Sequence, residues 1–229
     1  MEPVKSVQLR IGASISSILN SMDLNFPSGL ELESVAGEGR RSIVYKARYR
    51  AETVALKIYR PEFVEKYRKK YNVNIADFEM SRNEAFRRVP KLFRYAAKPL
   101  GVIGKDGKHS LAFLQEFING ITLMELGRKK GGLPGSVLQA GEVIVKEAEA
   151  VGLHDLDLFY KNILVREQEG VWYPVIYDFN LMPQYRYPPN PLLAFMYRTG
   201  LHKKSHRDYR CIAQWKKTLP FESRSTEDE

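Results

Sequence analysis

Hydrophobic residues in the first half of the chain recur in short runs that glycine and charged residues separate. The runs at residues 30–37, 42–49 and 53–60 predict three successive β-strands, and a turn at residues 50–52 joins the last two. A charged helical pattern follows at residues 62–94, with Pro61 at its start and Pro90 interrupting or ending it. Residues 98–120 then predict a hairpin that turns at residues 105–107.

The second half of the chain has a helical character. Two amphipathic stretches lie at residues 121–130 and 136–152, and strand-like runs lie within residues 154–167 and 171–181. We therefore predict an α+β protein with a β-rich part over residues 28–119 and a reduced helical part over residues 120–222. We expect residues 1–27 to form an N-terminal extension that is helical at 14–22, and residues 223–229 to form a disordered tail.

The chain is basic, with a net charge of +9. This excess favours an anionic partner, such as a nucleotide, a phosphorylated glycan, an anionic membrane lipid or nucleic acid. A basic surface without such a partner is the alternative. Because no RNA- or DNA-binding motif is recognisable, nucleic acid is the least favoured of these partners.

Two further features limit the class of protein. The single cysteine, Cys211, excludes an internal disulfide and a multi-cysteine zinc site. No stretch approaches the roughly 20 unbroken apolar residues that span a bilayer, and the first residues do not resemble a signal peptide. We therefore expect a soluble cytoplasmic protein.

Residues 37–47, GEGRRSIVYKA, place a glycine-rich turn between two predicted strands. Gly37 and Gly39 match the first two glycines of G-x-G-x-x-G-x-V, Ser42 stands in place of the third, and Val44 is in register. Glycine lets backbone N–H groups approach phosphates that a side chain would hold off. An ordinary tight hairpin would explain the same glycines.

The next predicted strand contains VALK, in which Lys57 ends an apolar run. A lysine in a buried strand is costly unless an anionic group meets it, and ATP phosphates and a glutamate on the following helix are the natural candidates. Glu84 is the preferred glutamate and Glu79 the alternative. The competing interpretations are an edge-strand lysine that reaches solvent and, for Glu84, a solvated pair with Arg88.

Residues 154–165, HDLDLFYKNILV, contain an aspartate and an asparagine with four residues between them. Phosphoryl transfer needs a carboxylate that orients the attacking hydroxyl and an amide oxygen that binds Mg²⁺. Asp157 and Asn162 have this spacing, whereas Asp155 follows His154 but lies two residues too far from Asn162. A helix N-cap would explain either aspartate alone but not the whole string.

Residues 175–181, VIYDFNL, place Asp178 directly after an apolar run. This is the position expected for the Mg²⁺-binding aspartate of D-F-G, and here Phe179 and Asn180 complete the triplet. Asparagine tolerates the left-handed backbone conformation better than most residues, so its exchange for glycine is mild. A surface turn after a strand is the alternative.

In their order and rough spacing, these four segments resemble the signature set of protein kinases over residues 36–181. The resemblance implies a bilobal protein-kinase-like fold that binds ATP and Mg²⁺. It implies that Lys57 holds the α- and β-phosphates, that Glu84 orients Lys57, and that Asp157 is the catalytic base.

The resemblance also implies further binding residues. Asn162 and Asp178 would bind Mg²⁺, and the glycine-rich turn would cover the phosphates of the nucleotide. The stretch that resembles the kinase hinge would offer backbone groups of Glu116 to Ile118 to adenine.

Three features depart from the protein kinases. Ser42 replaces a glycine, His154 lies three residues before Asp157, and no A-P-E follows Asn180. With little chain left for a peptide-binding platform, the sequence is more similar to small atypical bacterial kinases, particularly the lipopolysaccharide-core kinases that phosphorylate Kdo or heptose.

That similarity implies a lipid-linked sugar as acceptor and a place at the inner membrane face, where the basic run at residues 197–210 would meet an anionic membrane or glycan phosphate. A solvated helix face would explain the same run. A pseudokinase that binds nucleotide without turnover, and an atypical Ser/Thr protein kinase, are the competing functions.

Overall fold

The computed structural model describes residues 26–104 and 110–217. The helix expected at residues 14–22, the turn expected at 105–107 and the tail expected at 223–229 lie outside these residues. The chain divides into two compact units: residues 1–84 with 97–117, and residues 85–96 with 118–229. The sequence pattern predicted one continuous β-rich part, whereas residues 85–96 group with the second unit.

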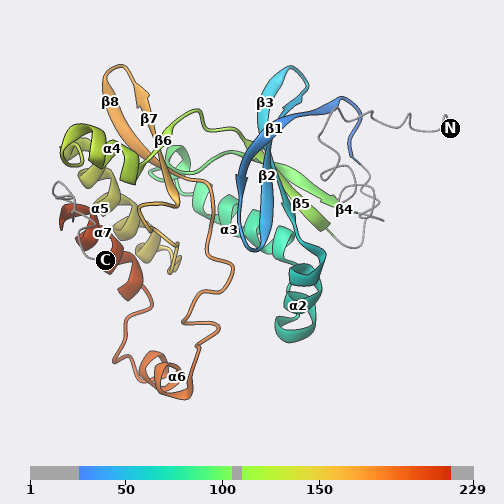
Figure 1. The fold of residues 1–229 in the computed structure, drawn as a ribbon. Coiled ribbons are helices and arrows are strands. Elements are labelled where there is room, and N and C mark those ends of the chain that lie inside the picture. Colours follow the sequence, from blue (N-terminus) through green and yellow to red (C-terminus); the bar gives the residue numbers. More distant parts are fainter. Residues whose placement is uncertain (1–25, 105–109, 218–229) are drawn as a thin grey trace, which may run out of the picture. The chain divides into compact units, whose positions relative to one another are not determined.

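The first unit contains a five-stranded antiparallel sheet in the order β1-β2-β3-β5-β4 (Figure 1). Its strands are β1 (Leu30–Glu38), β2 (Ser42–Tyr49), β3 (Glu52–Tyr59), β4 (Pro99–Gly104) and β5 (Ser110–Glu116). Arg50 and Ala51 join β2 to β3 with φ of 50° and 67°, the left-handed pair that a two-residue hairpin turn requires. One sheet face forms a hydrophobic core that includes Leu30, Tyr45 and Leu56.

Two helices follow β3 where the sequence pattern predicted one stretch. The first, α2 (Pro61–Tyr71), ends at Asn72, whose φ of 51° is left-handed. The second, α3 (Ile75–Arg87), follows Asn74, whose side-chain oxygen accepts a hydrogen bond from the Ala76 amide at 3.0 Å. The two asparagines therefore divide the charged stretch.

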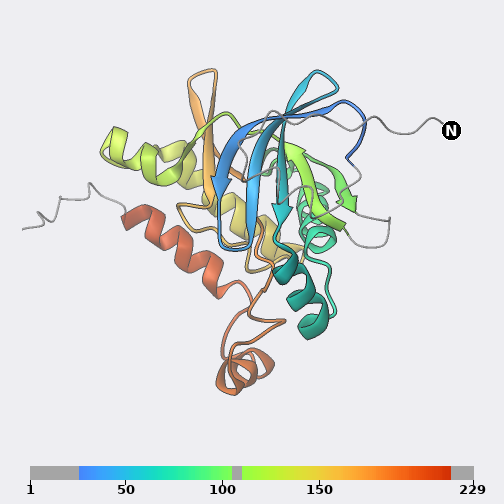
Figure 2. The same cartoon turned by 45° about the vertical axis from the view of Figure 1, so that its right-hand side comes forward.

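The second unit combines a small sheet, in the order β6-β7-β8, with helices (Figure 2). Its elements are the 3-10 helix η1 (Phe93–Tyr95), β6 (Ile121–Thr122), α4 (Leu123–Lys130), α5 (Gly135–Ala150), β7 (Ile163–Gln168), β8 (Val171–Ile176), α6 (Pro191–Arg198) and α7 (His206–Lys217). Thr122 and Glu125 form a capping box that starts α4. Within the described ranges, every helix is too short or too polar to cross a bilayer.

Helices α5 and α7 pack closely in the core of the second unit (Figure 2). A Cβ added to Gly141 of α5 would lie 2.7 Å from the Trp215 ring and 2.9 Å from Ile212, both on α7. Trp215 is 1% exposed, and its indole N–H donates to the Leu158 carbonyl at 2.9 Å. The contact between the two helices therefore also fixes the loop that precedes β7.

Replacing Gly141 with alanine is expected to destabilise the second unit by about 1–3 kcal/mol, because the added methyl group overpacks the helix contact. Thermal unfolding followed by circular dichroism measures the loss. Gly135→Ala is the matched control, since it adds the same group to α5 where no described atom lies within 4 Å of the new Cβ. Equal melting temperatures for the two variants would contradict the close packing.

Candidate active site

Lys57 lies on the central strand of the first unit. The register places it between Val44 of β2 and Phe113 of β5. Its neighbours Leu56 and Ile58 belong to the hydrophobic core, so strand alternation turns Lys57 to the opposite face. Lys57 is only 5% exposed, which rules out a solvent-facing lysine on a sheet edge.

Glu79 of α3 meets this lysine. Lys57 Nζ donates to the two carboxylate oxygens at 3.0 Å and 2.9 Å, and the Tyr59 hydroxyl donates to the same carboxylate. Glu79 is fully buried, so both members of the ion pair are removed from water. Removing either partner would leave an uncompensated buried charge, which costs about 3–5 kcal/mol.

This geometry corrects the preference for Glu84 as the partner of Lys57. Glu79 and Glu84 lie on one helix, and their separation in sequence turns their side chains roughly 140° apart around its axis. Since Glu79 faces Lys57, Glu84 points in another direction, and it is half-buried. The sequence pattern predicted one helix where the structure has α2 and α3. The start of α3 decides which of its residues face the sheet, so the single predicted helix gave the wrong glutamate.

The glycine-rich turn joins β1 to β2. The Gly39 amide donates to the Ser42 carbonyl at 2.9 Å, which closes the hairpin. No described atom lies within 4 Å of a Cβ added to Gly37, and the contact at Gly39 is an ordinary 3.6 Å. Both glycines have backbone conformations outside the left-handed region. The packing and backbone of the described residues therefore do not require glycine at either position.

Glu116 and Ile118 lie where the chain passes from the first unit to the second. The Glu116 amide donates to the Lys98 carbonyl at 2.8 Å, and its carboxylate accepts from the Lys98 amide at 3.1 Å. Ile118 is buried. The N–H of Glu116 is thus used within the sheet. A ligand would therefore meet the carbonyl of Glu116 rather than its N–H.

The loop between α5 and β7 brings Asp157 and Asn162 together. Asn162 Nδ2 donates to Asp157 Oδ2 at 3.0 Å. Asp157 is half-buried and has a φ of 69°, a conformation that is uncommon for residues other than glycine and that occurs often at functional sites. Because the amide nitrogen of Asn162 faces Asp157, the Oδ1 atom of Asn162 points away from Asp157.

Asp155, the alternative catalytic aspartate, is 2% exposed and bound within the protein. Its carboxylate accepts from Arg207 Nη1 and from the Gln184 amide, each at 2.6 Å. These bonds tie the loop to α7 and to the segment after β8. The half-buried Asp157 is therefore the better placed of the two carboxylates to meet a substrate.

Asp208 of α7 is a site residue that the sequence patterns did not single out. Its two carboxylate oxygens accept from the backbone amides of Asp155 and Leu156, at 2.6 Å and 2.8 Å. Asp208 is 2% exposed, and it shares one helix face with the buried residues Cys211, Ile212 and Trp215. The position of this carboxylate within an apolar helical stripe could have predicted its burial. The basic residues around it instead favoured an exposed, cationic helix face.

Cys211 is poorly suited to act as a nucleophile. It is a buried free thiol on α7. Burial, together with the nearby Asp208 carboxylate, raises the pKa of the thiol to about 12. The reactive thiolate is therefore scarce at neutral pH.

Asp178 lies two residues after the end of β8 and is half-buried. The Phe179 side chain is buried against Phe86, with the ring centroids 5.4 Å apart in an edge-to-face arrangement. Asn180 Oδ1 accepts from the Met182 amide at 3.0 Å. The buried Phe179 ring and the Asn180 hydrogen bond therefore hold the backbone that follows Asp178. The segment is thus not a loose surface turn.

The oxygen-bearing residues of this unit fit Mg²⁺ better than a transition metal. In the part of the chain that the structure describes, no three His, Cys, Asp or Glu side chains gather closely enough to hold a metal ion. Mg²⁺ does not need such a cage, because it commonly takes one or two carboxylates, keeps several waters and shares phosphate oxygens. The carboxylate of Asp178 and the amide oxygen of Asn162 are oxygen groups of the kind that this mode uses.

The solved structures that resemble this chain include kinase domains. A double mutant of the PknI kinase domain from Mycobacterium tuberculosis matches with a TM-score of 0.53 and 18% identity, over 84% of this chain and 74% of that one. A single mutant of the same domain matches with a TM-score of 0.53 and 19% identity, over 84% of this chain and 76% of that one. This chain has a protein-kinase-like fold.

The first unit is the β-rich lobe of this kinase-like fold, and the second is the helical lobe. The bilobal α+β fold predicted from the sequence is thus confirmed. No protein-family model matches the sequence, and no curated protein matches it. At this level of identity the likeness establishes the fold and leaves the acceptor open.

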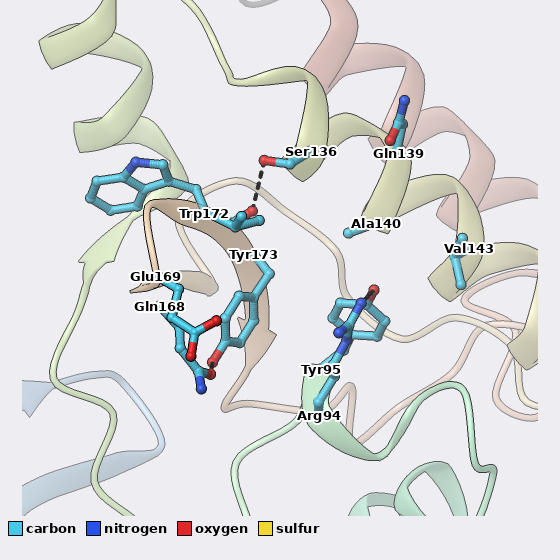
Figure 3. Close-up of a pocket in the computed structure, with 11 residues that line it drawn as sticks. Arg94, Tyr95, Ser136, Gln139, Ala140, Val143, Gln168, Glu169, Trp172 and Tyr173 are labelled. Carbon is cyan, nitrogen blue, oxygen red and sulfur yellow. Dashed lines mark hydrogen bonds between the residues drawn. The ribbon is translucent and has the colours of Figure 1, made fainter.

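The helical lobe of the kinase-like fold also has a pocket of about 550 Å³ between η1, α5 and the β7–β8 hairpin. Figure 3 shows Arg94 and Tyr95 on one side of it and Tyr173 on the other. The Arg94 guanidinium lies 4.9 Å from the centre of the Tyr95 ring. The pocket includes the tip of the β7–β8 hairpin. Asn162 and Asp178 both lie at the other end of this hairpin, before β7 and after β8. The pocket is therefore separate from the candidate catalytic residues.

Proposed function

We propose that the protein is an ATP- and Mg²⁺-dependent phosphotransferase that transfers the terminal phosphoryl group of ATP to a hydroxyl. The observation that carries this proposal is the buried Lys57–Glu79 ion pair within a protein-kinase-like fold. A buried ion pair is often no more stabilising than apolar residues of similar volume, so stability alone does not explain it. A lysine that binds ATP phosphates would give the ion pair a function beyond stability.

The β-rich lobe would hold the phosphates. Lys57 would donate to the α- and β-phosphates, with Glu79 fixing the position of its amine. The turn that contains Gly37, Gly39 and Ser42 would present backbone N–H groups to the same phosphates. Since the described residues around this turn do not require glycine there, close approach of a phosphate supplies a reason for both glycines.

Adenine would lie against the same lobe. Val44 is adjacent to Lys57 in the strand register and would pack on the base. The Glu116 carbonyl and the backbone of Ile118 would offer hydrogen bonds to its edge, as in the hinge of protein kinases.

The helical lobe would supply the metal ligands and the base. Asp178 and Asn162 Oδ1 would hold Mg²⁺, which when bound neutralises phosphate charge. Asp157 would accept a hydrogen bond from the acceptor hydroxyl, aim its oxygen at the phosphorus and take its proton. The Asn162 amide would keep the Asp157 carboxylate in place.

A non-protein acceptor, with a lipopolysaccharide-core sugar favoured, is the second part of the proposal. Between Asp178 and the start of α7 at His206 the chain forms one short helix, α6, which leaves little structure for presenting a peptide. The basic residues around it would suit a phosphorylated or lipid-linked glycan. On this proposal the protein works in the cytoplasm, at the inner membrane face.

A pseudokinase that binds nucleotide in a regulatory role is the second candidate. Two departures favour it: Ser42 in place of the third loop glycine, and the position of His154 three residues before Asp157. An atypical Ser/Thr protein kinase would share the active site and differ only in its acceptor.

Replacing Asp178 with alanine separates these functions. We expect the wild type to hydrolyse or transfer the γ-phosphate of ATP only with Mg²⁺, and the variant to lose at least about 100-fold in rate because a metal ligand is gone. Glu167→Ala, which removes an exposed carboxylate of β7, is the matched control and should retain full activity. Nucleotide binding without turnover in the wild type would favour the pseudokinase. Unchanged activity of Asp178→Ala would remove the metal assignment.

A further inference from the structure

Residues 179–207 contain no aspartate or glutamate, although the whole chain has 27 acidic residues among 229. This stretch, the acid-free segment, links Asp178 to Asp208 and contains α6. It carries arginine or lysine at positions 186, 198, 203, 204 and 207. Its fixed charges are therefore all positive.

The acid-free segment also exposes large apolar side chains. None of the residues of α6 is buried. Leu192 and Phe195 of this helix are 67% and 55% exposed, and Leu201 just beyond it is 70% exposed. Figures 1 and 2 both show α6 standing apart from α5 and α7. A helix this short gains little from its own hydrogen bonds, so an exposed apolar side on it indicates a binding surface.

Apolar and basic side chains alternate within a few residues of each other here. Lys203 and Lys204 are exposed and lie two and three residues after Leu201, and Arg198 ends α6. Tyr185, Tyr187 and Tyr197 add half-buried aromatic rings of the kind that favour the boundary between lipid and water. This combination of aliphatic, aromatic and cationic groups matches the surface of an anionic bilayer.

We propose that the acid-free segment docks on an anionic lipid bilayer. Leu192, Phe195 and Leu201 enter the boundary between headgroups and acyl chains, while Lys203 and Lys204 lie over the anionic headgroups. Nucleic acid would attract the lysines but gives no place to the aliphatic side chains. The core of a protein–protein interface would accept the aliphatic side chains but is depleted in lysine.

Docking would also place the catalytic residues. The segment starts directly after Asp178 and ends directly before Asp208, which holds the backbone of the loop that contains Asp157. If the proposed phosphotransferase function holds, this arrangement brings Asp157 to the bilayer surface and selects a hydroxyl carried by a membrane lipid or lipid-linked glycan. The docking itself does not depend on that function.

Vesicle sedimentation with the full chain tests the proposal. The wild type is expected to bind vesicles of phosphatidylcholine mixed with phosphatidylglycerol, and to bind pure phosphatidylcholine far more weakly. Lys203→Gln/Lys204→Gln should weaken binding to the mixed vesicles roughly 30-fold. Leu192→Ser/Phe195→Ser should weaken it at least about tenfold.

Two control variants make the same chemical changes elsewhere in the helical lobe. Lys129→Gln/Lys130→Gln removes two exposed lysines of α4, and Phe93→Ser/Val151→Ser removes two side chains that are each 53% exposed. Both controls should bind vesicles like the wild type. Melting curves for all four variants show that each remains folded at the assay temperature.

The outcomes separate docking from its alternatives. Equal binding to both vesicle types, no binding, or equal losses in the control variants would overturn the proposal. Loss with the lysine pair but not with the apolar pair, together with competition by duplex DNA, would indicate a polyanion site instead. Vesicle binding by a protein that does not turn over ATP would support docking and refute the proposed enzyme.

Discussion

Replacing Lys57 with methionine is expected to abolish phosphoryl transfer, with a loss of at least about 100-fold. The lysine amine would no longer reach the phosphates, and methionine keeps the length of the side chain without its charge. The same change leaves Glu79 charged and fully buried, so it should also destabilise the β-rich lobe by about 3–5 kcal/mol. Activity and stability must therefore be measured on the same protein preparation.

A double variant separates the two effects. Lys57→Met/Glu79→Gln removes both charges, keeps a side chain that can bond the Tyr59 hydroxyl, and should recover much of the lost stability. Its phosphotransfer rate should stay as low as that of the single variant. Lys66→Met, at an exposed position of α2, is the control and should change neither property. Recovery of activity together with stability would show that Lys57 has only a structural role.

Replacing Asp157 with asparagine is expected to lower kcat about 10²- to 10⁴-fold while nucleotide affinity stays nearly unchanged. Asparagine preserves the size of the side chain but cannot take the proton of the acceptor hydroxyl. Single-turnover transfer from radiolabelled ATP measures the rate, and titration with a fluorescent nucleotide measures the affinity.

Asp155→Asn is the matched comparison for this variant. Asp155 is buried and paired with Arg207, so its replacement should lower the melting temperature. Asp157 is half-buried, and its replacement should leave the melting temperature close to that of the wild type. A stable Asp155→Asn variant without activity, alongside an active Asp157→Asn variant, would reverse the assignment of the base.

The sequence predicted those features that depend on residues close together in the chain. The strands that hold the glycine-rich turn and Lys57 follow from short apolar runs, and the pairing of Asp157 with Asn162 follows from their spacing. Glu79 was only the alternative because helix phase depends on where a helix begins. The polar residues Asn72 and Asn74 set that point, and hydrophobic spacing does not reveal it.

Other features depend on contacts between distant segments. Asp208 holds amides that lie more than 50 residues earlier in the chain, and no local pattern shows where a buried carboxylate finds its donors. The exposure of Leu192 and Phe195 could not be predicted from the sequence for the same reason. An apolar stripe in a sequence predicts that something covers it, but the fold decides whether that partner belongs to the same chain.

The most direct test of the account uses a lysine-reactive acyl phosphate of ATP, which transfers its acyl group to an amine beside the bound phosphates. After incubation with Mg²⁺ and digestion, mass spectrometry identifies the labelled lysine. Labelling is expected at Lys57, and an excess of ATP should prevent it. Labelling confined to exposed lysines, with Lys57 unmodified and no protection by ATP, would contradict it.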